Sequence, residues 1–71
     1  MSIKATKVMN WVDSNLPPLT WRILVMKQMK LLMNHKIFPA KIDDTTVFND
    51  EILKAFKETI KNDYGKEMPP L

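Results

Sequence analysis

The chain has 71 residues, no cysteine, one histidine and a formal net charge of +3. This length allows one domain at most, and the absence of cysteine excludes disulfides, thiolate metal sites and a catalytic cysteine. A single histidine cannot form a zinc site without help from carboxylates or a second chain, so we expect no metal and no cofactor. Because a chain of this size buries only about 60% of its unfolded surface, oligomerisation or a partner is the remaining source of extra stability.

The charge is divided unevenly along the chain. Residues 1–42 hold seven basic residues and one acidic residue, whereas residues 43–71 hold seven acidic and four basic residues. The net charges are therefore +6 and −3. A basic front half predicts contact with an anionic partner. Two halves that face each other, in the fold or in a dimer, would explain the same asymmetry, and both interpretations stay open.

The first predicted element is a helix over about residues 3–16. Ser2 is the expected N-cap, and Pro17 and Pro18 end the helix. Trp11 lies at the rim of the apolar face and is interpreted either as packing or as an aromatic anchor for a partner. The apolar face itself follows i, i+3, i+4 spacing and consists of Ala5, Val8, Met9, Val12 and Leu16.

The second predicted helix, residues 21–35 with Thr20 as its N-cap, is the most apolar part of the chain. Its Leu, Val and Met side chains cover an arc of roughly 220°, whereas the apolar stripe of a surface helix is a little over 100° wide. We therefore expect this helix to be the central one, or to be covered partly by another chain. A membrane span is disfavoured, because Arg22, Lys27 and Lys30 interrupt the run.

One edge of this helix is rich in methionine. Met26, Met29 and Met33 follow i, i+3, i+7 spacing. Methionine serves both as core filler and at adaptable binding surfaces. If the other helices leave this edge uncovered, it forms an exposed apolar patch, and such patches mark interfaces. The predicted partner-binding residues are Trp11, Arg22, Met26, Met29, Lys30 and Met33.

Residues 36–48 form a long connection that is too apolar for a free loop. We expect it to lie against the core, with a short extended pair around Ile37 and Val47 as one option. His35, just before this segment, is interpreted as a surface residue that complements the dipole at the end of the second helix.

The third predicted helix covers residues 50–64. Asn49 is a strong N-cap, and the acidic residues that follow it suit the positive end of the helix dipole. Gly65, the only glycine, stands where a helix-ending residue is expected. Residues 67–71 are predicted to be a flexible tail outside a single domain of residues 1–66.

No motif for phosphate binding or for nucleophilic, metal or acid–base catalysis occurs in the chain. We therefore predict that the protein is not an enzyme and has no catalytic residues. Nucleic-acid binding is the alternative, through phosphate contacts. With one arginine in the chain, bidentate reading of guanine is nearly excluded. The residues predicted for this alternative are Lys4, Lys7, Lys30 and Lys36.

These observations predict an all-α fold, a small three-helix bundle of residues 3–16, 21–35 and 50–64 with a central second helix. The N-terminal MSIKATKV lacks the features of a signal peptide, so we expect a cytoplasmic protein. The predicted function is a small interaction or regulatory protein that binds a protein partner, or a second copy of itself, through the Met edge. Its size and composition fit an accessory protein of a phage or mobile element. No small-molecule substrate or membrane partner is expected.

Overall fold

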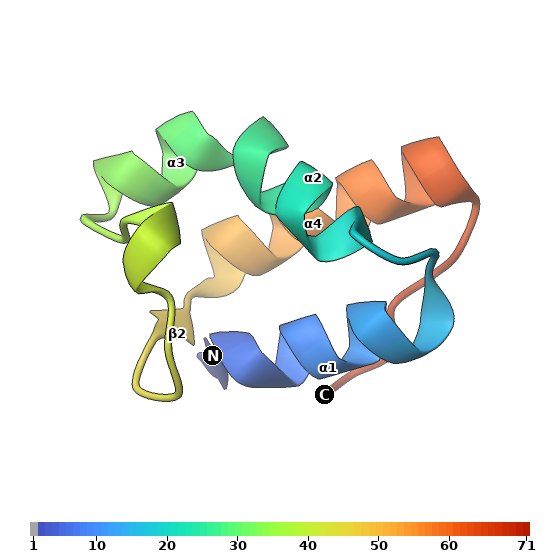
Figure 1. Ribbon diagram of the computed structural model, residues 1–71, viewed down its shortest axis with the longest axis horizontal. Helices are drawn as coiled ribbons and strands as arrows, with labels where there is room; N and C mark the ends of the chain where they lie inside the picture. Colours follow the sequence, from blue (N-terminus) through green and yellow to red (C-terminus); the bar gives the residue numbers. More distant parts are fainter. Residues whose placement is uncertain (1) are drawn as a thin grey trace.

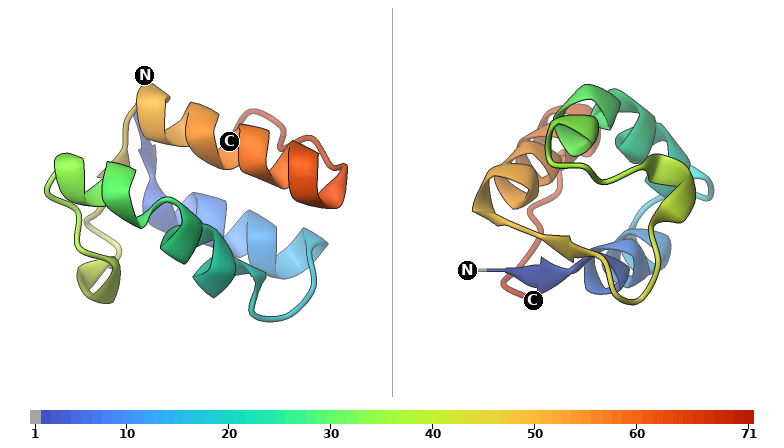
Figure 2. Two further views of the ribbon diagram at one scale, coloured as in Figure 1. Left: turned by 90° about the horizontal axis from the view of Figure 1, so that it is seen from above. Right: turned by 90° about the vertical axis from the view of Figure 1, so that its left-hand side faces the viewer.

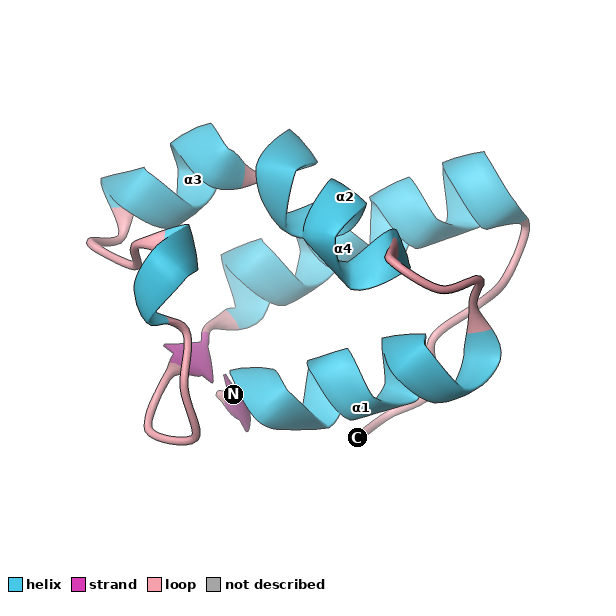
Figure 3. Cartoon of the chain, viewed as in Figure 1, coloured by secondary structure: helices cyan, strands magenta, loops and turns pink. Residues whose placement is uncertain are grey.

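The computed structural model describes residues 2–71, in which helices make up most of the chain and the strands are very short (Figure 3). The elements are β1 (Ile3–Lys4), α1 (Ala5–Asn15), α2 (Thr20–Lys27), α3 (Met29–Asn34), the 3-10 helix η1 (Pro39–Lys41), β2 (Val47–Phe48) and α4 (Asp50–Tyr64). A mostly helical chain is confirmed, but a strictly all-α architecture is not, because β1 and β2 form an antiparallel sheet.

Helix α4 begins and ends where the sequence predicts. The side chain of Asn49 accepts a hydrogen bond from the Ile52 amide at 3.0 Å, which satisfies one free donor of the first turn. Gly65 adopts the left-handed conformation with φ of 65°, and its amide donates to the Lys61 carbonyl at 2.9 Å. Its buried face consists of Ile52, Leu53, Phe56 and Ile60.

Helix α1 starts two residues later than predicted, because Ile3 and Lys4 are extended. They pair with Phe48 and Val47 respectively. The Ala5 amide then donates to the Thr46 carbonyl at 2.9 Å. Ser2 is therefore not the N-cap, which is Lys4, and Lys4 forms no side-chain capping bond. A two-residue strand has no periodicity, so the sequence pattern could not separate it from the helix that follows.

The predicted second helix is divided into α2 and α3 at Gln28. This residue leaves the helical conformation (φ −99°, ψ 13°), and its side-chain amide donates to Thr59 Oγ1 of α4 at 2.6 Å. Thr20 is not the N-cap but the first residue of α2, and its hydroxyl donates to the Pro17 carbonyl at 2.6 Å. The cap position belongs to Leu19, which has a left-handed φ of 68°.

The core lies between three helical segments, which are α1, α4 and the α2–α3 pair (Figures 1 and 2). Helix α2 contacts α1, α3 and α4, which agrees with its predicted central place. The rings of Trp21, Phe48 and Phe56 stack inside the molecule, with centroids 5.1 Å apart for Phe48–Phe56 and 5.5 Å for Trp21–Phe56. Aromatic rings at such distances contribute beyond their buried area.

Residues 36–48 lie only partly against the core, since Phe38 and Val47 are exposed. Ile37 and Ile42 are half-buried there, and Phe48 is fully buried. The extended residue Val47 pairs with Lys4, however, and not with Ile37. Because β2 of this connection pairs with β1, the N-terminal strand lies next to the start of α4.

The segment after α4 crosses to α1 (Figures 1 and 2). Met68 is buried in the core and Leu71 is half-buried against it. The Lys66 ammonium donates to the Asn15 carbonyl at 2.8 Å. Residues 67–71, predicted as a flexible tail outside the domain, thus contribute one core side chain. Their flexibility stays a prediction.

Candidate functional site

The outward face of α2 and α3 is largely apolar. Its exposed side chains include Leu19 (66%), Ile23 (45%), Met26 (67%), Met29 (38%) and Met33 (49%). An isolated exposed apolar residue needs no explanation, but five of them between residues 19 and 33 do. We call this row, together with the two basic residues within it, the Met surface: Leu19, Arg22, Ile23, Met26, Met29, Lys30 and Met33.

The Met surface is exposed because the inward half of the same helices already fills the core. Leu24, Val25 and Leu32 are buried, and Trp21 and Leu31 pack partly against them. Residues on the opposite side of a helix point away from these neighbours. The sequence is thus apolar on both sides of α2–α3, and the fold covers only one of them.

The charges within the Met surface are both positive. Arg22 and Lys30 are exposed, whereas Lys27 at its margin forms an ion pair with Asp63 of α4. The pKa of Lys27 is raised above its ordinary value of 10.5. The main cause is the hydrogen bond to Asp63, and the second is the negative charge of that carboxylate. Lys27 is therefore already paired within the chain, and Arg22 and Lys30 carry the positive charge of the surface outward.

A hollow of about 350 Å³ lies at the edge of the Met surface, where η1 approaches α2. Trp21, Arg22, Val25 and Met26 form its α2 side, and Pro39 and Ala40 form the other side. Trp21 thus has two roles, since its ring also stacks on Phe56 in the core. A largely apolar hollow of this kind suits an inserted side chain of a binding partner.

The structure places five of the six predicted partner-binding residues on this one surface: Arg22, Met26, Met29, Lys30 and Met33. Trp11 is elsewhere, half-buried on α1 against the core. The sequence reasoning missed Leu19 and Ile23. Neither is part of the methionine series on which the prediction was based. A search for apolar residues opposite the buried face would have found both.

The residues predicted for nucleic-acid binding do not form one surface. Lys4 and Lys7 border a groove between α1 and α4. Lys30 lies on α3, which is at the opposite edge of the molecule from α1 (Figure 1), and Lys36 follows the end of α3.

His35 connects two elements within the fold. Its Nδ1 lies 3.3 Å from the Asn49 side-chain amide, and its Nε2 lies 2.6 Å from Glu51 Oε1. Because Asn49 Oδ1 accepts from Ile52, its amide nitrogen is the atom that faces His35. The histidine thus links the end of α3 to the start of α4, a structural role that goes beyond complementing a helix dipole.

Within residues 2–71, no three His, Cys, Asp or Glu side chains gather in a way that could hold a metal ion. In the same range, no helix is long and apolar enough to cross a membrane. Comparisons with protein-family models, with curated proteins and with solved structures found no match for this chain.

Proposed function

We propose that this protein is a small, non-enzymatic cytoplasmic interaction protein that binds another protein through the Met surface. The observation that carries the proposal is the exposed apolar row on α2–α3, which the chain itself leaves uncovered. Contiguous apolar surface costs free energy in water, and a partner that covers it recovers about 25 cal/mol for each Å² buried.

The positive charges of the Met surface favour a different protein, and not a second copy of this chain, as the binding partner. A symmetric pair of identical Met surfaces would bring four positive charges, Arg22 and Lys30 of each copy, into one interface. Like charges placed together oppose association, whereas acidic residues around an apolar centre would complement them. The favoured partner therefore presents an aliphatic or aromatic side chain to the hollow beside Trp21 and Met26, with acidic residues at the rim.

The test compares Met26→Asp with Val47→Asp in capture experiments from a lysate of the source cell. Both substitutions place a carboxylate on an exposed apolar residue, but Val47 lies on β2, outside the Met surface. We expect the unchanged protein and Val47→Asp to capture the same partner. Met26→Asp should capture at least about tenfold less of it. A partner retained by all three proteins would contradict the proposal.

Self-association is tested separately by sedimentation equilibrium. We expect the unchanged protein to be monomeric, because its Met surface is positively charged. A dimer that Met26→Asp dissociates would instead assign the same surface to a second copy. A dimer that persists in Met26→Asp would show that the Met surface does not mediate self-association. An origin in a phage or mobile element stays a prediction from size and composition.

A further inference from the structure

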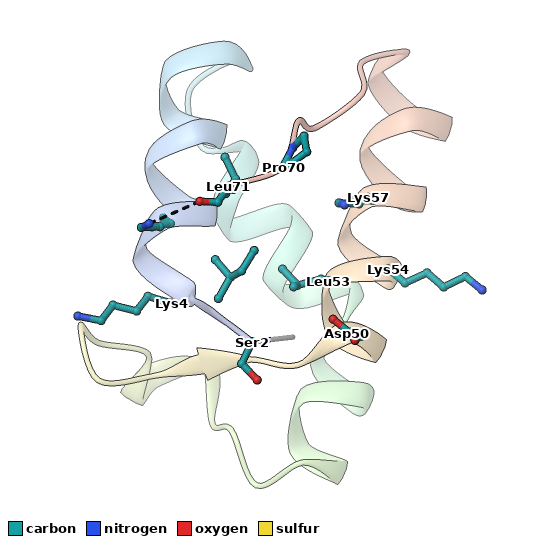
Figure 4. A pocket seen from close by; sticks show the side chains of 10 residues that line it. Ser2, Lys4, Asp50, Leu53, Lys54, Lys57, Pro70 and Leu71 are labelled. Carbon is teal, nitrogen blue, oxygen red and sulfur yellow. Dashed lines mark hydrogen bonds between the residues drawn. The ribbon is translucent and has the colours of Figure 1, made fainter.

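A second hollow lies on the side of the molecule away from α2, between α1 and α4 (Figure 4). Its volume of about 610 Å³ lies within the range of ligand pockets in proteins. Aliphatic side chains form its interior, with Ile3 from β1, Leu53 from α4 and Leu71 from the C-terminal segment. We call it the lysine groove, after the residues around its mouth.

Four lysines border this groove: Lys4 and Lys7 on the α1 side, and Lys54 and Lys57 on α4. Asp50 is the only acidic residue among those that line it. In Figure 4 the side chains of Lys4 and Lys54 extend outward on opposite sides of the groove. The arrangement is therefore an aliphatic floor with lysines on two sides, of which Lys4 and Lys54 extend away from it (Figure 4).

The chain itself shows which kind of molecule fits there. Pro70 and Leu71 lie at one end of the groove in an extended segment, and Leu71 is half-buried against the core (Figure 4). The Lys7 ammonium lies 3.5 Å from the Leu71 carbonyl oxygen, toward which it donates. A leucine side chain and a main-chain oxygen beside a lysine thus form one end of the groove.

We propose that the lysine groove binds an acidic peptide segment of a partner protein, with an aliphatic side chain on Ile3 and Leu53 and carboxylates beside the flanking lysines. Charge complementarity supports this occupant, because four lysines and one acidic residue, Asp50, line a groove with an apolar floor. Such a segment lies beside Pro70 and Leu71, which form one end of the groove. The site is separate from the Met surface and does not depend on it.

Nucleic acid fits the same groove less well. Proteins that bind single strands stack bases on aromatic rings, and the residues that line the groove include no aromatic side chain. None of the lining residues is an arginine, so the planar, bidentate phosphate contact is also missing. An aliphatic floor without such groups favours the leucine-type side chain of a peptide.

The test measures fluorescence anisotropy of a short fluorescein-labelled peptide in which aspartate or glutamate alternates with leucine. Two control peptides replace either the acidic residues by glutamine or the leucines by serine. We expect the first peptide to bind, with an affinity that falls as salt rises, and both controls to bind at least about tenfold more weakly. Equal binding of either control would overturn the proposal, and so would a failure of the acidic leucine peptide to bind.

Charge reversal locates the binding site. Lys54→Glu with Lys57→Glu should weaken binding by at least about tenfold, since two attractions become repulsions. The matched control is Lys36→Glu with Lys41→Glu, which changes the net charge equally at exposed residues outside both the groove and the Met surface. Circular dichroism checks that both variants are folded. Equal weakening in the two variants would show a non-specific charge effect and contradict the site.

Deletion of residues 69–71 tests whether this end of the groove takes part in binding, and it retains the buried Met68. Affinity for the acidic leucine peptide should fall, because Pro70 and Leu71 line the groove. Unchanged affinity would contradict binding at this end of the groove. A single-stranded DNA of the same net charge that binds more tightly than the peptide, and that loses affinity with the Lys54→Glu/Lys57→Glu variant, would assign the groove to nucleic acid instead.

Discussion

Helix α4 and the α2–α3 pair use apolar residues in different ways. In α4, the apolar residues Ile52, Leu53, Phe56 and Ile60 are buried, and the outward face is charged. In α2–α3, apolar residues fill the inward face and also most of the outward face. Folding alone therefore explains the sequence of α4, whereas it leaves Met26, Met33 and their neighbours without a structural role. Surface that folding does not explain is where a binding function is best sought.

The largest expected effect separates these two kinds of apolar residue. Phe56 is fully buried and stacks on Trp21 and Phe48, so Phe56→Ala should lower the free energy of unfolding by about 3–5 kcal/mol. Met26→Ala, on the exposed side of α2, should change it by less than about 0.5 kcal/mol. Urea denaturation followed by tryptophan fluorescence measures both. Similar losses would mean that the Met surface supports the fold, and the comparison would fail.

An intermediate effect concerns how the two helical regions begin. Helix α4 has a side-chain cap in Asn49, which also contacts His35, whereas α2 has none. Asn49→Ala should therefore cost about 1 kcal/mol of stability. Asn62→Ala, an exposed change within the last turns of α4, is the control and should cost nothing. If Asn62→Ala lost as much stability as Asn49→Ala, the effect would come from removing any asparagine side chain and not from removing the helix cap.

The smallest expected effect concerns the ion pair that joins the two regions, Lys27 with Asp63. Because the pKa of Lys27 is raised in the folded protein, this stabilisation is fully present below the ordinary value of 10.5 and is lost as pH rises through the folded-state pKa. When the pH is raised from neutral to strongly alkaline, the free energy of unfolding should therefore fall less in Asp63→Asn than in the unchanged protein. Denaturation curves at several alkaline pH values measure the difference. Parallel losses in the two proteins would show that the pair does not contribute.

Local sequence signals were sufficient for α4. Its cap at Asn49, its apolar spacing and its terminating Gly65 all act within a few residues, and the structure confirms each. The same type of signal failed at the N-terminus and at Gln28. Lys4 is extended because it pairs with Val47, and Gln28 donates to Thr59, so both depend on residues far away in the chain. No local propensity encodes such partners.

The candidate sites show the same division. Spacing alone grouped the methionines on one helix edge, where they were expected to be either core filler or a binding surface. The lysine groove was not predicted, because its walls come from β1, α4 and residues 70–71, which only the folded chain brings together. The sequence also divided Lys4 and Lys7 from Lys54 and Lys57 by charge balance, whereas the fold places all four around one hollow.

By itself, the sequence determined that the chain is mostly helical, where α4 begins and ends, and that one helical region has more apolar surface than a surface helix needs. These properties follow from periodicity, caps and proline positions, which act over one or two helical turns. Only the tertiary structure decided which apolar side chains the core covers and which remain outside. That choice depends on how α1, α4 and the small sheet share the inward face of α2–α3, and the outward row of Met26, Met29 and Met33 is what they leave exposed.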